Sequence, residues 1–165
     1  MQLLSAEGGK GLIMGPLGVA RQTIREAEKI GVEVAYVHDA AEASRTLSSR
    51  PGRGPQIAFC NYDRLHLLDP AAFVGVALDE SSILKSFSGS IKKSLVSGFA
   101  STPFRLSASA TPAPNDIEEL TNHADFLGIM SSQEMRSTFF IADSRGEFMK
   151  YRLKGHAASA FYEWL

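Results

Sequence analysis

Val74-Gly75-Val76-Ala77-Leu78-Asp79-Glu80 is the stretch of this sequence that decides the fold. A short segment that is apolar throughout, here residues 73–78, is typical of a strand buried on both faces of a parallel sheet. Two carboxylates, Asp79 and Glu80, follow this strand directly. Because ligands of open parallel sheets bind beyond the carboxyl ends of the strands, both side chains are expected at a ligand-binding edge.

Outward from this stretch, apolar strands alternate with amphipathic helices. Further strands are expected over residues 11–15, 32–37, 56–60 and 104–109. Helices are expected over residues 19–30, 40–47, 91–99 and 116–126. In the less regular tail, short strands are expected over residues 138–142 and 151–153 and a final helix over residues 157–165. This alternation predicts an α/β fold in which a parallel sheet is flanked by helices on both sides. The residues that follow the other strands share the predicted ligand-binding edge: Pro16-Leu17, Asn61-Tyr62 and Ala110-Thr111.

The composition is that of an ordinary folded protein. A chain of 165 residues with 44% hydrophobic residues suits one domain with one core. The formal net charge of -1 excludes a global basic field, so nucleic acid would have to be held by local loops. The single cysteine, Cys60, lies in an apolar run and is expected in the core. No membrane span or signal pattern is present, and we expect a cytoplasmic location.

The adjacent carboxylates have two interpretations. Phosphoryl transfer from a nucleotide needs a carboxylate near the magnesium ion and a group that positions the attacking water. Asp79 suits the first task through a metal-bound water, and Glu80 suits the second as general base. Magnesium keeps several waters, so one protein carboxylate can suffice. The alternative is that the pair only caps the next helix, and the pair alone favours that alternative.

Several segments in order resemble the motifs of superfamily-two DEAD/DEAH-box-like helicases. Asp79-Glu80-Ser81-Ser82 resembles their Walker B motif, motif II, and Ser109-Ala110-Thr111 resembles motif III. Thr111-Pro112 and Leu84-Lys85 are similar to the Swi/Snf-like branch. The departure is Ser81-Ser82, where that branch commonly has Ala or Gly and then the His that links motif II to motif III.

Two earlier segments resemble the nucleic-acid motifs of the same family. Residues 12–17, which end in Pro16-Leu17, look like motif Ia, and Asn61-Tyr62 with Leu65 is similar to the family's Asn/Thr-Tyr-x-x-Leu turn. Taken singly, a proline turn and a capping Asn with a packed Tyr explain these segments better. Four motifs in the family's order, each at a strand end, favour the family instead, and the resemblance covers about residues 11–130.

The resemblance implies a RecA-like, P-loop NTPase type of first motor domain, of the phage and bacterial type, that uses ATP and Mg²⁺. It implies that Asp79 and Glu80 contact the nucleotide and catalyse its hydrolysis, and that Asp79 holds Mg²⁺ through water. It gives motif III, Ser109, Ala110 and Thr111, a coupling role. DNA is the expected partner and RNA is the alternative. The implied nucleic-acid contacts are Pro16, Leu17, Asn61 and Tyr62.

The P-loop pattern G-x-x-x-x-G-K-[ST] that such an ATPase needs does not occur in the sequence. Gly8-Gly9-Lys10-Gly11 comes nearest, but no Ser or Thr follows its lysine. Residues 1–7 resemble the end of the helix that follows a P-loop. We therefore interpret the chain as a fragment that lacks its P-loop strand. Residues 1–130 would be part of the first motor domain, and residues 131–165 the start of a linker toward an absent second motor domain.

Two functional classes remain open from the sequence. One is an ATP-driven nucleic-acid helicase or translocase, represented by part of its first domain. The other is a non-catalytic remnant or interaction module that keeps the fold without turnover. On either interpretation, the 165-residue chain alone is expected not to hydrolyse ATP.

Overall fold

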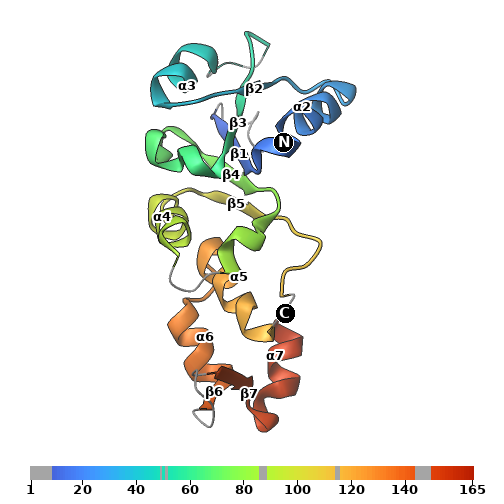
Figure 1. Cartoon of the computed structure of the whole chain (residues 1–165), viewed down its shortest axis with the longest axis vertical. Coiled ribbons are helices and arrows are strands. Elements are labelled where there is room, and N and C mark those ends of the chain that lie inside the picture. The colour runs from blue at the N-terminus through green and yellow to red at the C-terminus, as the bar shows by residue number, and fades with distance from the viewer. Residues whose placement is uncertain (1–8, 49, 51, 86–88, 114–115, 144–149) are drawn as a thin grey trace.

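The computed structural model describes residues 9–48, 50, 52–85, 89–113, 116–143 and 150–165. Residues 1–7, interpreted above as the end of a helix, lie outside this part of the chain. Figure 1 shows the sheet and its helices at one end of the long axis, and a smaller helix and hairpin unit at the other end. Within the described residues, no helix is long and apolar enough to cross a membrane.

The main sheet is five-stranded and parallel throughout, which confirms the predicted α/β class. Its neighbouring strands follow the order β2-β3-β1-β4-β5. The strands are β1 (Gly11–Gly15), β2 (Val34–Tyr36), β3 (Ile57–Asn61), β4 (Gly75–Leu78) and β5 (Phe104–Ser107). Each predicted strand exists, with ends shifted by up to two residues. The largest correction at the site is β5, which ends at Ser107 instead of Ser109.

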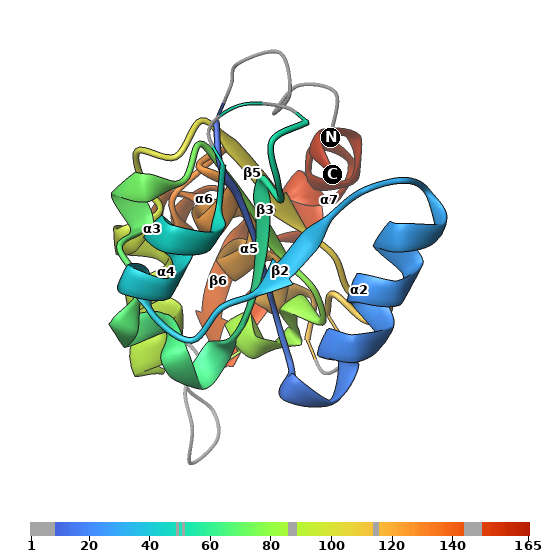
Figure 2. The same cartoon turned by 90° about the horizontal axis from the view of Figure 1, so that it is seen from above.

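Helices cover the two faces of the sheet, as Figure 2 shows with α2 on one side and α3 and α4 on the other. Side chains of β1 alternate between the two faces of the sheet. Leu12 and Met14 belong to the main core, and Ile13 packs against the core under α2. Asp39 begins α3 as expected, because its carboxylate accepts a hydrogen bond from the backbone nitrogen of Glu42. The helices are α2 (Ala20–Lys29), α3 (Ala40–Thr46), α4 (Ser90–Gly98) and α5 (Leu120–Leu127).

Short 3₁₀ helices follow most strand ends and set the direction of the chain there. Asp116 begins one of them, η5, instead of the α-helix that was expected directly after it. The 3₁₀ helices are η1 (Leu17–Val19), η2 (Tyr62–Leu67), η3 (Pro70–Ala72), η4 (Ser81–Lys85), η5 (Ile117–Glu119) and η6 (Gly155–Ala157).

The last part of the chain differs most from expectation. Residues 132–139 form helix α6 (Ser132–Phe139), so the strand predicted over residues 138–142 is wrong at its start. It begins at Phe140, as β6 (Phe140–Asp143), and pairs antiparallel with β7 (Lys150–Leu153) before helix α7 (Ala158–Trp164). These elements form a separate hydrophobic core with α5. Its buried residues are Ala124, Met135, Phe139, Phe140 and Phe161. The domain boundary at residue 130 remains a prediction.

Candidate functional site

The carboxyl ends of four strands bring the predicted site residues to one edge of the sheet. Gly15 of β1 is opposite Asn61 of β3, and Leu78 of β4 is opposite both Met14 and Ser107 of its neighbours. The residues that follow these positions therefore lie side by side at this edge, although they come from distant parts of the sequence.

Asp79 continues the β1–β4 ladder for one residue beyond the strand. Its backbone nitrogen donates to the Met14 carbonyl at 2.7 Å. A β-carbon at Gly15 would lie 3.3 Å from the Asp79 β-carbon and 3.0 Å from the Phe59 ring, so any larger residue would require these neighbours to move by a few tenths of an ångström. The Asp79 side chain is half-buried at this edge. One hard oxygen donor is thereby presented where a ligand can reach it.

Glu80 has a backbone conformation that bulky L-residues rarely adopt. Its φ angle is 52°, and among the described residues it is the only one besides glycines with a positive φ. The left-handed conformation costs about 1–2 kcal/mol for a residue with a β-carbon. Strain of this kind clusters at functional sites, where surrounding contacts over-determine it. The Glu80 side chain itself is exposed, so its carboxylate is accessible to solvent and ligands.

Ser81 connects the segment after β4 to the segment after β5. Its backbone nitrogen donates to the Ala108 carbonyl at 2.8 Å, and the residue is fully buried. The Ser81 hydroxyl has no hydrogen-bond partner among the described residues. The space available at Ser81 therefore suits a small side chain, in agreement with the Ala or Gly that the resemblance expects there.

The predicted motif III residues lie on the surface beside this bridge. The Ser109 hydroxyl accepts a hydrogen bond from the Thr111 backbone nitrogen at 3.2 Å. Ala110 and Thr111 are exposed. All three follow Ala108, whose carbonyl joins this segment to the one that carries Asp79 and Glu80.

His123 of α5 is a site residue that sequence reasoning missed. Its Nε2 lies 3.0 Å from the Pro112 carbonyl, and its Nδ1 lies 2.7 Å from the Ser107 hydroxyl. Because a carbonyl only accepts, Nε2 must carry a hydrogen, and Nδ1 of the neutral ring then accepts from Ser107. The helix therefore holds both ends of the segment from residue 107 to residue 112. The sequence around His123 contains no motif that predicts this role.

The predicted nucleic-acid residues fall into an exposed and a buried pair. Pro16 and Leu17 are exposed, with 63% of the Leu17 surface accessible. Asn61 is only 6% exposed, and its amide oxygen accepts from the Tyr36 hydroxyl at 2.9 Å. Tyr62 is 7% exposed, so its ring lies beneath the surface of the edge.

The Tyr62 hydroxyl donates to the Asp79 carbonyl at 2.8 Å. Burial raises the pKa of this hydroxyl above its ordinary value, and the neighbouring carboxylates of Asp79 and Glu80 raise it further. The phenol therefore stays protonated at neutral pH and remains a donor. The structure unites Tyr62 with the carboxylate pair, a contact that the sequence did not predict.

A buried polar network supports the segment after the carboxylates. The Lys92 ammonium donates to the Asn122 side-chain oxygen at 2.7 Å and lies 3.8 Å from the Asp125 carboxylate. Asn122 in turn donates to the Leu84 carbonyl at 2.9 Å. Burial lowers the pKa of Lys92, which the charge of Asp125 partly opposes. These contacts join η4, α4 and α5 directly behind the site.

The site's donor set suits a water-mediated magnesium ion better than a fully protein-bound one. No group of three or more His, Cys, Asp or Glu side chains within the described ranges could hold a metal. Magnesium usually keeps several waters and is bound by one or two carboxylates plus phosphate oxygens. The half-buried Asp79 carboxylate fits the single protein contact of such a site.

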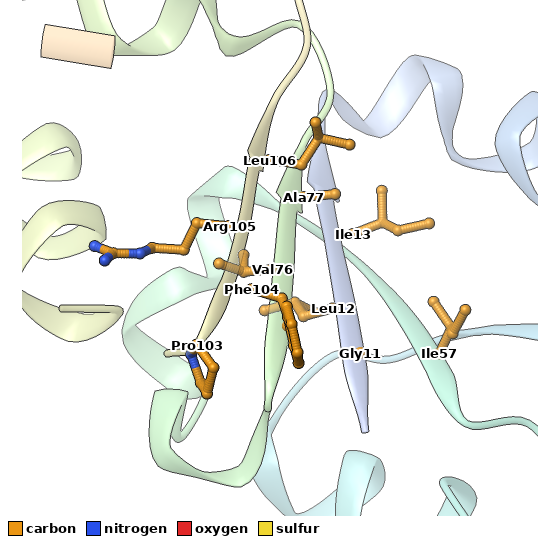
Figure 3. A pocket seen from close by; sticks show the side chains of 11 residues that line it. Gly11, Leu12, Ile13, Ile57, Val76, Ala77, Pro103, Phe104, Arg105 and Leu106 are labelled. Carbon is orange, nitrogen blue, oxygen red and sulfur yellow. The ribbon is translucent and has the colours of Figure 1, made fainter. Parts of the chain in front are cut away.

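A hollow lies on one face of the sheet and is not lined by Asp79 or Glu80. It has a volume of about 530 Å³, and Figure 3 shows Ile13, Ala77 and Leu106 on its walls while Arg105 points away. The Arg105 guanidinium instead donates to the Phe126 carbonyl at 2.9 Å on the opposite face. Its lining is mostly apolar and comes from β1, β3, β4 and β5.

Comparison with known proteins identifies the fold. No family model and no curated protein sequence matches the chain. Among solved structures, the chain is similar to one described as the Sulfolobus solfataricus SWI2/SNF2 ATPase core in complex with dsDNA. The TM-score is 0.61 at 21% identity, over 81% of this chain and 28% of that chain. The fold is therefore the RecA-like α/β fold, and this chain spans less than a third of the length of that protein.

Proposed function

We propose that this chain is part of the first motor domain of an ATP-dependent, Swi/Snf-like nucleic-acid translocase of the phage and bacterial type. The observation that carries the proposal is the pair Asp79-Glu80 at the carboxyl edge of β4, with Glu80 in a left-handed conformation. A structural cap would not require that conformation, because any residue with a short polar side chain caps a helix without it. Strained backbone conformations of this kind cluster at functional sites, which supports the catalytic interpretation.

The roles within the site follow from charge and exposure. Asp79 would hold Mg²⁺ through a water molecule, and the exposed Glu80 carboxylate would accept the proton of the attacking water. Bound Mg-ATP would supply the phosphoryl group and the charge that makes its transfer possible. The 165 residues contain no P-loop pattern, so on this proposal the P-loop contacts to the phosphates would come from residues outside this sequence.

The nucleic-acid partner would lie along the same edge. The structural neighbour was solved with dsDNA, and we therefore propose DNA as the partner, with RNA as the alternative. Exposed Pro16 and Leu17 would contact the partner directly. Asn61 and Tyr62 are buried, so they would support the nucleic-acid contact surface from below without forming its outer layer. Ser109, Ala110 and Thr111 would couple nucleic-acid binding to ATP hydrolysis at the carboxylates.

The test is Glu80→Gln in the longer protein that joins this sequence to a P-loop and a second motor domain. A general base contributes about 10²- to 10⁴-fold in rate, so ATP hydrolysis should fall by that factor while ATP affinity stays near normal. Glu33→Gln is the matched control, because Glu33 is an exposed carboxylate outside the site. A Glu80→Gln protein with the turnover of the control would remove Glu80 from this role.

A second candidate function is a non-catalytic interaction module. Two observations favour it: the missing P-loop pattern and the uncovered apolar hollow beside Leu106. The two candidate functions predict different coding sequences upstream of Met1. An in-frame G-x-x-x-x-G-K-[ST] pattern upstream of Met1 supports the motor, and an upstream stop codon without such a pattern supports the module.

A further inference from the structure

Pro16 interrupts the hydrogen-bond ladder between β1 and β4 at the site. The register pairs Met14 with Leu78, and the Asp79 nitrogen donates back to the Met14 carbonyl. In a parallel ladder, the next bond would run from the backbone nitrogen of residue 16 to the Asp79 carbonyl. Proline has no N–H group. The ladder therefore lacks its donor for the carbonyl that directly precedes Glu80.

The Tyr62 hydroxyl occupies the place of this missing donor. It reaches the Asp79 carbonyl at 2.8 Å from the chain that follows β3, on the far side of β1 from β4. The Tyr62 ring is buried in the main core, which fixes the position of its hydroxyl. The hydroxyl thereby satisfies a carbonyl of the half-buried Asp79 that would otherwise lose its ladder partner, and an unpaired backbone carbonyl away from water is unfavourable.

The two peptide groups on either side of the Glu80 α-carbon are each held by a short hydrogen bond, and the Glu80 carbonyl also accepts two longer ones, from the Ile83 nitrogen and the Ser82 hydroxyl, both at 3.4 Å. Tyr62 fixes the carbonyl of the Asp79–Glu80 peptide. Ala108 fixes the nitrogen of the Glu80–Ser81 peptide, because its carbonyl accepts from Ser81 at 2.8 Å. The orientations of these two planes define φ and ψ of the residue between them. The pair of bonds thus holds Glu80 at its φ of 52° against the preference for right-handed backbone.

We propose that Tyr62 is a positioning residue for Glu80: its hydroxyl replaces the donor that Pro16 lacks and thereby directs the Glu80 carboxylate. The proposal rests on the general-base role of Glu80 for its catalytic meaning, but its structural part stands alone. It also gives Pro16 and Tyr62 a joint purpose within the protein, in addition to the nucleic-acid contacts proposed for them. Without the tyrosine hydroxyl, the Asp79–Glu80 peptide can rotate, and Glu80 can relax to an unstrained conformation.

The test compares three variants of this chain by amide hydrogen exchange and NMR chemical shifts. Tyr62→Phe keeps the ring and removes only the donor. Tyr62→Phe combined with Pro16→Ala returns a backbone N–H to the ladder at residue 16. Tyr162→Phe is the control, because Tyr162 is 60% exposed on α7 and far along the chain from the site.

In Tyr62→Phe, the protection of the Ser81 amide against hydrogen exchange should fall about tenfold, and the NMR chemical shifts of Glu80 should change. Adding Pro16→Ala should restore most of the Ser81 protection and return the Glu80 chemical shifts toward their original values. Tyr162→Phe should leave both readouts unchanged. Unchanged Ser81 and Glu80 signals in Tyr62→Phe would overturn the proposal. An even loss of protection across β3 and β4, without recovery on Pro16→Ala, would also overturn it, because Tyr62 would then only support the core.

The same variants in the longer protein separate this proposal from the proposed function. If Glu80 is the general base, Tyr62→Phe should lower kcat with little effect on KM for ATP, and Pro16→Ala should recover part of the loss. Full turnover of Glu80→Gln would refute the general-base role and leave the exchange result intact. Unchanged kcat in Tyr62→Phe, with Glu80→Gln inactive, would refute the positioning role alone.

Discussion

Replacing Glu80 by glycine and by alanine measures the strain in the site directly. Both changes remove the carboxylate, so the difference between them reports only the backbone. At a φ of 52°, a β-carbon costs about 1–2 kcal/mol, and glycine avoids that cost. Glycine also has more conformational freedom in the unfolded chain, which costs about 0.4–1 kcal/mol. The balance predicts that Glu80→Gly is more stable than Glu80→Ala by about 0.5–1 kcal/mol.

The control for this comparison is an exposed helical position with ordinary backbone. Arg25 lies in the middle of α2 and is exposed. Arg25→Gly should be less stable than Arg25→Ala by about 1 kcal/mol, because glycine is a poor helix former. The order of glycine and alanine is therefore expected to invert between the two positions.

Chemical denaturation measures both differences, and thermal unfolding gives a second reading. For a chain of this size, 1 kcal/mol shifts the melting temperature by about 2–4 °C. Alanine more stable than glycine at residue 80, with the expected order at residue 25, would refute the left-handed conformation. The argument that Tyr62 and Ala108 hold Glu80 in that conformation would then lose its basis.

Three further predictions address coupling, the isolated chain and the buried network. Ser109→Ala with Thr111→Ala in the longer protein should lower nucleic-acid-stimulated ATPase more than basal ATPase, and equal losses would mean that the hydroxyls only support the fold. Calorimetry of the 165-residue chain with Mg-ATP should show at most weak binding and no turnover, because the sequence has no P-loop pattern; micromolar binding with turnover would contradict this. Burial lowers the pKa of Lys92 below 10.5, so the unfolded state holds the Lys92 proton in the window between the lowered and the ordinary value, and the contribution of Lys92 to stability rises with pH there. Lys92→Met should remove that rise in alkaline denaturation series, and an unchanged slope would count against it.

The sequence was sufficient for the strands and for the position of the carboxylates, because these depend on local patterns. An apolar run followed by Asp79-Glu80 needs no knowledge of the neighbours to be placed at a strand end. The ends of β5 and of α6 were less predictable. Thr138 and Phe139 favour strands intrinsically, yet Ser131 and Glu134 form a capping box that begins a helix before them. That signal was present in the sequence as Ser-x-x-Glu, and it outweighed the propensity.

The contacts that shape the site are the part that local patterns could not supply. Tyr62 and Asp79 are 17 residues apart, and their hydrogen bond depends on β1 lying between β3 and β4. The absence of a donor at Pro16 can be read from the sequence, but its consequence appears only once the register is known. The left-handed Glu80 has the same origin, since Glu has no intrinsic preference for that conformation.

The departure at Ser81-Ser82 has a structural counterpart on another element. In the family, as the resemblance describes it, a histidine after the carboxylates links motif II to motif III. Here the Ser81 nitrogen and the Ala108 carbonyl join the two segments through the backbone. His123 holds the second segment from α5, at Ser107 and at Pro112. A displacement of residues 107–112 would therefore pull on Ser81 without any side chain at residue 82. The missing histidine is thus no argument against coupling between the two segments, because a backbone bridge transmits such a shift independently of the side chain.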